Sequence, residues 1–102
     1  MTKLYSIIQI DTKPEYREAF LRAARELIDR LQDELGRLEH AIHASPTTPC
    51  QLIVTIRWHD KEAMAAHFAS RHLQDYLKET APYVAQPSVY RTFTIETEHT
   101  LL

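Results

Sequence analysis

The sequence has little of several residue types, and each shortage excludes a class of protein. Its 102 residues include one glycine, so neither the GxGxxG fingerprint of dinucleotide-binding proteins nor a phosphate-binding P-loop is present. The SxxK and GxSxG patterns of an activated serine are missing as well. The single cysteine, Cys50, cannot form an internal disulfide, which favours a reducing compartment. We expect no organic cofactor, so that any chemistry depends on side chains and on the substrate itself.

A charge excess and a long apolar run are also missing. Twelve Lys and Arg are scattered among fourteen Asp and Glu, so there is no basic stripe that would neutralise a nucleic acid backbone. The N-terminus MTKLYSIIQID goes directly into a strand-like pattern, without the apolar region of a signal peptide. We therefore expect a cytoplasmic protein with no nucleic acid and no membrane partner.

What is present is the composition of a globular chain, with 44% hydrophobic and 25% charged residues, which predicts one domain over residues 1–102. The alternation before Asp11 predicts a first strand. Thr12 and Glu15 have the spacing of a capping box, which predicts that a helix begins there. Apolar residues at helical spacing continue this helix to Gly36, which we expect to be its left-handed stop; they are Tyr16, Phe20, Ala23, Leu27, Leu31 and Leu35.

The second half predicts two strands, a helical region and a last strand. RLEHAIHA and QLIVTIRW are separated by SPTTPC, whose prolines mark a loop between antiparallel strands. Asp60 is an expected N-cap for a short helix through Ala69, and a second helical stretch, RHLQDYLKETAPYV, is disturbed by Pro82. SVYRTFTIE is the last strand. This order predicts an α+β fold, a ferredoxin-like sandwich with its helices on one face of a four-stranded antiparallel sheet.

Such a sandwich leaves one face of the sheet without helices. We expect that face to carry some combination of Tyr5, Ile7, Ile53 and Tyr90, an apolar patch too large to leave in water. Packing against a second copy of the same sheet would cover it, so the sequence predicts a homodimer.

The six histidines do not have the spacing of metal ligands. His67 and His72 are five residues apart, which directs them about 140° away from each other on a helix. His40 and His43 fall on opposite faces of their strand, and no HExxH or paired CxxC completes a set. We therefore expect no metal.

Two histidines are candidates for a functional site. His67 borders the apolar face of the short helix, where it is either a structural imidazole bonded to a backbone carbonyl or a functional group. His40 shares its face with Leu38, Ile42 and Ala44, and a titratable group there needs a partner or a cavity. If the core opens at that level, both histidines would line an aromatic cavity together with Trp58, Tyr76 and Tyr83.

The run RWHDKEAMAAHFASRHLQDYL resembles the W-x(5–7)-A-x-x-H-x-x-(S/T)-x-H segment of the antibiotic biosynthesis monooxygenase domain, particularly its quinol monooxygenase-like members. The matching positions are Trp58, Ala63, His67, Ser70 and His72. The resemblance implies a ferredoxin-like fold and dimers whose sheets face each other as a barrel. It also implies oxidation of phenols or quinols by molecular oxygen without flavin, haem or metal.

The sequence also departs from this family. Ile56 stands where many members have a glutamate, and His40 stands where an aromatic residue is frequent. Haem-degrading relatives carry Asn, Trp and His at the places of Ser6, His67 and Leu77, so the resemblance disfavours haem degradation.

The leading hypothesis is a cofactor-independent monooxygenase that oxidises a phenolic or hydroquinone molecule with O2. A histidine with a pKa near 6.5 suits the removal of the phenolic proton, and we expect His67 in this role with His40 second. The residues expected on the substrate-binding side are Trp58, His72, Tyr76 and Tyr83, with His72 orienting the helix junction. Two alternatives remain open: an isomerase or other proton-transfer enzyme, and a non-catalytic dimeric ligand-binding module.

Overall fold

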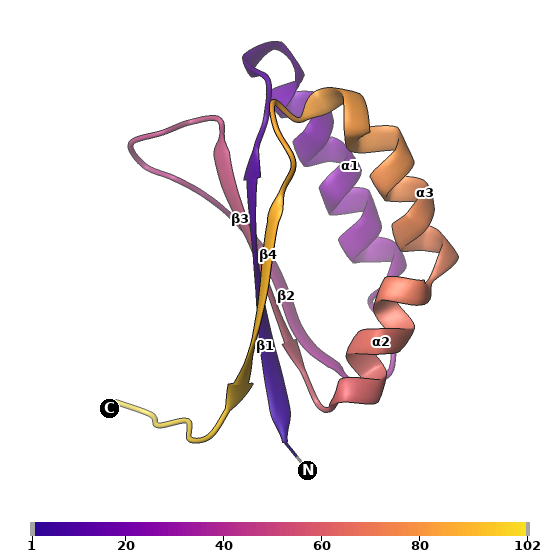
Figure 1. Ribbon diagram of the computed structural model, residues 1–102, viewed down its shortest axis with the longest axis vertical. Helices are drawn as coiled ribbons and strands as arrows, with labels where there is room; N and C mark the ends of the chain where they lie inside the picture. Colours follow the sequence, from indigo (N-terminus) through magenta and orange to yellow (C-terminus); the bar gives the residue numbers. More distant parts are fainter. Residues whose placement is uncertain (1, 102) are drawn as a thin grey trace.

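In the computed structural model, which describes residues 2–101, a four-stranded antiparallel sheet is covered on one face by helices (Figure 1). The strand order is β2-β3-β1-β4. This arrangement confirms the predicted ferredoxin-like α+β sandwich. In chain order the elements are β1 (Lys3–Asp11), η1 (Pro14–Tyr16), α1 (Arg17–Arg30), β2 (Arg37–Ala44), β3 (Gln51–Trp58), α2 (Lys61–Ala69), α3 (Arg71–Thr80), η2 (Ala81–Tyr83) and β4 (Val89–Ile95).

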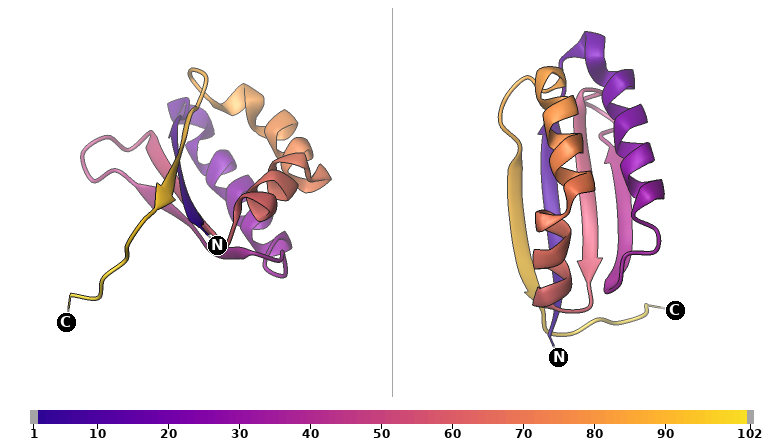
Figure 2. Two further views of the ribbon diagram at one scale, coloured as in Figure 1. Left: turned by 60° about the horizontal axis from the view of Figure 1, so that its bottom comes forward. Right: turned by 90° about the vertical axis from the view of Figure 1, so that its right-hand side faces the viewer.

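The helices form one layer above the sheet. Figure 2 shows α1 beside α3, with α2 and α3 following each other along the layer. Strand alternation directs every second residue of β1 and β3 into the space beneath them. The core formed there includes Leu4, Ile10, Phe20, Leu52, Ile56 and Trp58.

The start of α1 differs from the prediction. Thr12 does not cap a helix; it forms a bridge with Val84 and donates its hydroxyl to the Cys50 carbonyl. A short 3-10 turn with Pro14 in its first positions then leads into α1 at Arg17. The capping-box prediction was wrong because the Thr12 hydroxyl is bound to the Cys50 carbonyl and does not cap the helix.

The end of α1 also differs. The helix stops at Arg30, and Leu35, which the helical spacing placed on its apolar face, is 89% exposed. Gly36 does have a positive φ of 80°, but it lies at the entrance to β2 and not at the helix end. The chain between Arg30 and Gly36 is therefore a turn segment above the edge of the sheet.

The second helical region follows the prediction closely. The Asp60 carboxylate accepts a hydrogen bond from the Ala63 N–H, and the Ser70 hydroxyl accepts one from the Leu73 N–H. Ser70 therefore ends α2 and begins α3. After Thr80 the helix tightens into the 3-10 turn η2, which contains Pro82.

The face of the sheet that carries no helix is partly apolar, as predicted, but one of the residues expected on it lies on the other face. Tyr5, Ile7 and Ile53 lie on it as expected, but Tyr90 pairs with Ile8 and points to the helical side. Its place is taken by the half-exposed residues Val89 and Phe93. Within residues 2–101, no helix is long and apolar enough to cross a membrane.

Candidate functional site

A cavity of about 390 Å³ lies between the sheet and the helical layer. Ligand pockets in proteins typically measure about 300–1,000 Å³. Most of the wall is apolar, and its polar side chains are His40, His67, Tyr76, Thr80, Ser88 and Tyr90. The exposed wall residues Leu77, Ala81, Ser88 and Tyr90 belong to α3, to η2 and to the strand β4 with the loop before it. The cavity therefore opens between α3 and β4.

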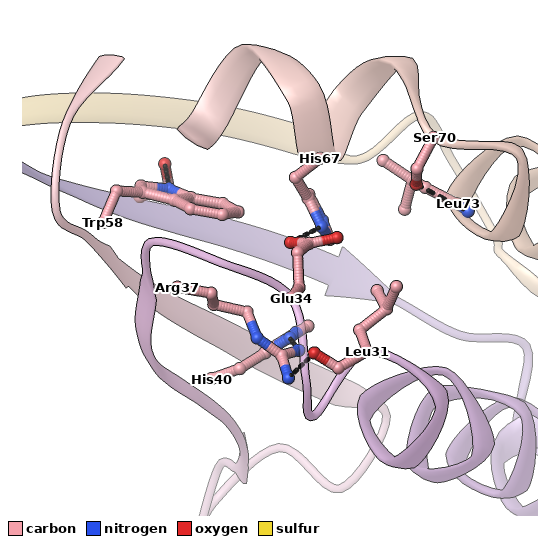
Figure 3. A network of polar contacts seen from close by, with 9 residues as sticks. Leu31, Glu34, Arg37, His40, Trp58, His67, Ser70 and Leu73 are labelled. Atoms are coloured by element: carbon pink, nitrogen blue, oxygen red, sulfur yellow. Dashed lines mark hydrogen bonds and ion pairs between the residues drawn. The ribbon is translucent and has the colours of Figure 1, made fainter. Parts of the chain in front are cut away.

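His67 is the most enclosed polar group of this wall, with 1% of the residue exposed. Its ring lies against Trp58, with 4.9 Å between ring centroids, and its edge meets Phe68. Its Nδ1 is 3.0 Å from the Glu34 Oε1, and Figure 3 shows the two side chains pointing toward each other from α2 and from the segment after α1. The imidazole is thus fixed by an aromatic wall on one side and a carboxylate on the other.

Burial lowers the pKa of His67, and the nearby Arg37 guanidinium adds to this, while Glu34 acts in the opposite direction. The ring is therefore neutral at neutral pH. Because an ionised carboxylate can only accept, Nδ1 carries the proton and donates it to Glu34. The Nε2 of His67 then has a free lone pair, which is the arrangement of a histidine base oriented by a carboxylate.

Glu34 reaches His67 because of the tight turn before β2. The Glu34 N–H donates to the Leu31 carbonyl, and Leu31 is buried in the helical layer. Two residues later Gly36 accepts a hydrogen bond from the His59 N–H at 2.7 Å. A Cβ on Gly36 would lie 2.5 Å from the Cβ of Ala63, so the absence of a side chain lets this turn approach α2.

His40 enters the cavity from β2 on the sheet side. Its ring centroid is 6.0 Å from that of His67, with the rings nearly perpendicular. Its Nδ1 is 2.8 Å from an Arg37 guanidinium nitrogen, and Arg37 also donates to the Leu31 carbonyl (Figure 3). Burial, with smaller contributions from Arg37 and His67, lowers the pKa of His40 to about 4. His40 is therefore neutral under physiological conditions.

A β-bulge brings Arg37 onto the same face as His40. Residues three apart in a regular strand point to opposite faces, but the register of β2 against β3 shifts between Arg37 and Glu39. Arg37 pairs with Trp58 and His40 with Ile56, both on the helical side of β3. The expectation that Leu38 shares the face of His40 was wrong, because the shift falls on Leu38, which is 44% exposed.

Three of the predicted site residues meet in the cavity: His40, His67 and Tyr76. Burial raises the pKa of Tyr76, with a smaller contribution from Glu79, so the phenol stays protonated. Ile56, at the position of the family glutamate, supplies an apolar part of the wall.

The other three predicted residues lie elsewhere. Trp58 is fully buried behind His67, and its indole N–H donates to the Ser6 hydroxyl at 3.1 Å. Tyr83 stacks on Tyr16, with 5.1 Å between ring centroids, outside the cavity wall. The expectation that Trp58 and Tyr83 line the cavity was wrong. His72 is exposed in the first turn of α3 and borders a separate shallow depression between α1 and α3.

Sequence reasoning missed Glu34 and Arg37, the partners of the two histidines. The helical spacing up to Gly36 predicts that Glu34 is part of the long helix, and the strand pattern predicts that Arg37 is the first residue of a regular strand. No pattern in the sequence indicates either partner, because the helical spacing continues past the end of α1 at Arg30 and the register shift of β2 is visible only in the structure. In the part of the chain that the structure describes, no group of three or more His, Cys, Asp or Glu side chains is placed to hold a metal ion.

Residues 4–79 match the sequence model of the antibiotic biosynthesis monooxygenase family. The chain belongs to this family. It is 27% identical over 84 residues to a protein of Bacillus subtilis (strain 168) named "Putative monooxygenase YcnE", a match that covers 81% of this chain and 88% of that protein.

Solved structures share the fold of this antibiotic biosynthesis monooxygenase domain. The structure of Rv0793 from Mycobacterium tuberculosis superimposes with a TM-score of 0.88 at 17% identity, covering 96% of this chain and 99% of that one. A structure described as "Putative antibiotic biosynthesis monooxygenase from Nitrosomonas europaea" gives a TM-score of 0.87 at 20% identity, covering 92% and 90%. At these identities the likeness establishes the fold alone.

Proposed function

We propose that the protein is a cofactor-independent monooxygenase that oxidises a phenolic or hydroquinone molecule with O2. The observation that carries this proposal is the His67–Glu34 pair at the wall of an apolar cavity. A ring-shaped apolar substrate fits such a wall, and a neutral histidine with a free Nε2 suits the removal of its hydroxyl proton. Membership of the antibiotic biosynthesis monooxygenase family supports the oxidative reading.

In the proposed reaction, His67 Nε2 takes the phenolic proton, and Glu34 stabilises the imidazolium that forms. The phenolate gives one electron to O2, and the resulting radical and superoxide combine to form a C–O bond. The peroxide anion takes the proton back from His67 and becomes a hydroperoxide. The O–O bond and the C–H bond of the same ring carbon then break, which releases water and leaves a carbonyl on the ring. One oxygen atom enters the product and the other leaves as water, and the substrate supplies all four electrons, so the reaction needs no external reductant.

The apolar wall has a second part in this scheme. Most of the cavity is formed by aliphatic and aromatic side chains of β1, β3, α1 and α3. Such a wall excludes water, which would otherwise solvate the phenolate and hold its charge away from O2. The protein therefore contributes proton transfer, orientation and exclusion of water.

The experiment is oxygen uptake by purified, metal-stripped protein with a panel of hydroquinones and polycyclic phenols. We expect uptake above autoxidation, with a loss of about 10²–10⁴-fold in the rate of His67→Ala, because a general base contributes about this much. His72→Ala, which changes a histidine outside the cavity, is the matched control and should retain activity. Proton exchange or isomerisation of these compounds without oxygen uptake would instead support a proton-transfer enzyme, and binding with neither reaction would support a ligand-binding module.

We also propose that the active form is a homodimer joined through the open face of the sheet. The apolar side chains on this face include Tyr5, Ile7, Ile53, Val89 and Phe93. Phe93 and Val89 are 50% and 42% exposed in the single chain. A second copy of the same sheet would remove this apolar surface from water, and a two-fold axis needs only one self-complementary face.

A further inference from the structure

The two cavity histidines have different fixed partners at the same ring atom. The Nδ1 of His67 faces the Glu34 carboxylate, whereas the Nδ1 of His40 faces the Arg37 guanidinium. Within residues 2–101, no buried side-chain nitrogen or oxygen lacks a hydrogen-bond partner. Among the residues that the structure describes, neither ring has a hydrogen-bond partner at Nε2, so neither Nε2 atom is fully buried, and the cavity is the space that both rings border.

These partners impose opposite tautomers. A guanidinium has only donors, so the Nδ1 of His40 must accept and the proton of this neutral ring is on Nε2. A carboxylate has only acceptors, so the proton of His67 is on Nδ1. His67 therefore presents a lone pair to the cavity, and His40 presents an N–H. Two histidines that look equivalent in the sequence present an acceptor and a donor.

We propose that His40 is not a base but a hydrogen-bond donor to the substrate anion. Its Nε2–H donates a hydrogen bond to the phenolate oxygen that forms when His67 takes the proton. Arg37 is the positioning residue, because its contact with Nδ1 keeps the proton of His40 on Nε2. The inference rests on the proposed function for the identity of the substrate oxygen. It also specifies what the site recognises: a hydroxyl that must donate to one histidine and accept from the other.

The surroundings of the cavity make such a donor necessary. The His67 imidazolium and the Glu34 carboxylate together have no net charge, so this pair does little to neutralise the negative charge of the phenolate. The remaining wall is mostly apolar, and an unpaired anion in such a place is strongly disfavoured. The charged and titratable groups facing His40 are Arg37 and His67. Burial lowers the pKa of His40 most, these two groups add to the effect, and together they bring it to about 4 and keep the ring neutral. It therefore retains a single proton at Nε2 throughout the neutral range.

The first test does not depend on turnover. Nitrogen-15 NMR of the imidazole side chains at pH 7 distinguishes the Nδ1–H tautomer from the Nε2–H tautomer. We expect Nδ1–H for His67 and Nε2–H for His40. In Arg37→Met the His40 signals should move toward a mixture of tautomers, and Arg37→Lys, which keeps a cationic donor, should restore the Nε2–H form. An Nδ1–H or doubly protonated His40 in the wild-type protein would overturn the proposal.

The second test measures binding of a phenolate directly. The probe is 4-nitrophenol, whose visible absorption reports its ionisation, and 4-nitroanisole is the matched ligand without a hydroxyl. We expect the wild-type protein to bind the phenolate and to lower the pKa of the bound phenol. His40→Leu should weaken phenolate binding about tenfold or more, as expected for a lost hydrogen bond to a charged group, and should leave 4-nitroanisole binding unchanged.

Two further variants separate the donor from its support. His40→Gln keeps an amide N–H in reach of the cavity and should recover part of the phenolate affinity. His43→Gln, on the opposite face of the same strand, should bind both ligands like the wild type. The donor role would be refuted if His40→Leu bound the phenolate as tightly as the wild type does. It would also be refuted if the wild-type protein did not prefer the phenolate to 4-nitroanisole. Correct tautomers and phenolate binding without oxygen uptake would support the donor role and refute the monooxygenase.

Discussion

Gly36 and Ala63 are so close that a β-carbon on Gly36 would lie 2.5 Å from the Ala63 Cβ. This contact joins the turn after α1 to α2, and these two segments carry Glu34 and His67. The only glycine of the sequence is thus at the place where a side chain would separate the two halves of the candidate base.

Gly36→Ala should therefore destabilise the protein and loosen the contact between Glu34 and His67. The substitution combines a side chain at a φ of 80° with an overlap against α2, and we expect a loss of about 1–3 kcal/mol in the free energy of unfolding. Denaturant unfolding measures it. The double variant Gly36→Ala, Ala63→Gly removes the overlap and should recover part of the loss. A fully stable single variant would show that the turn tolerates displacement.

The main features of the fold could be predicted from the sequence because they depend on local patterns. Alternation in β1 and β3 determines which residues face the helices, and the side chains of Asp60 and Ser70 cap the helices that follow them. The end of α1 could not be predicted in this way, because Leu31 and Leu35 continue the helical spacing beyond the helix. Leu31 is buried and Leu35 is exposed, a difference that arises from the turn and not from hydrophobicity.

The candidate site was predictable only in part. His67 and His40 were found because a histidine beside apolar residues needs a partner, but the partner itself depends on tertiary structure. Glu34 meets a residue 33 positions away, and Arg37 shares a face with His40 only because of a β-bulge. Neither relationship follows from spacing in regular elements. Pairing partners across irregular segments are therefore the part of the site that requires the structure.

The stability of the protein should decrease when the pH falls below about 6.5. His40 and His67 have lowered pKa values in the folded protein, His40 to about 4, so below pH 6.5 the unfolded chain binds protons that the folded protein does not. The free energy of unfolding therefore decreases as the pH falls, and this decrease ends once the pH is below the pKa of the histidine in the folded protein. Each histidine contributes a slope of up to about 1.4 kcal/mol per pH unit.

Urea unfolding between pH 7.5 and 5 measures this dependence. His40→Phe removes one of the two buried imidazoles, and Arg37 and His67, the groups facing that position, remain. The slope of unfolding free energy against pH should therefore be smaller in this variant than in the wild type. His43→Phe, on the other face of the same strand, is the control and should keep the wild-type slope. Identical slopes in all three proteins would mean that His40 takes up a proton as readily in the folded protein as in the unfolded chain.

Phe93→Asp should convert the proposed homodimer to monomers. The side chain is 50% exposed in the single chain and lies on the open face of the sheet opposite Tyr5. A two-fold interface would bury two new carboxylates without partners, which disfavours association strongly. Analytical ultracentrifugation measures the change in mass. Leu35→Asp alters an apolar residue that is 89% exposed in the turn after α1, and this control should remain dimeric. A wild-type protein that sediments as a monomer would refute the dimer itself.

Glu34→Gln should lower turnover and move the acidic limb of the rate profile to lower pH. Glu34 raises the pKa of His67 against the effect of burial, so its replacement by a neutral amide leaves a weaker base with a lower pKa. The amide can also donate to Nδ1, which would place the proton of His67 on Nε2 and block the lone pair. We expect kcat/KM to fall by at least about tenfold, since both effects impair general base catalysis. Asp33→Asn, which neutralises the adjacent exposed carboxylate, is the control and should keep both the rate and its pH dependence. Unchanged kcat/KM and an unchanged acidic limb in Glu34→Gln would remove Glu34 from the mechanism and leave its bond to His67 a structural contact.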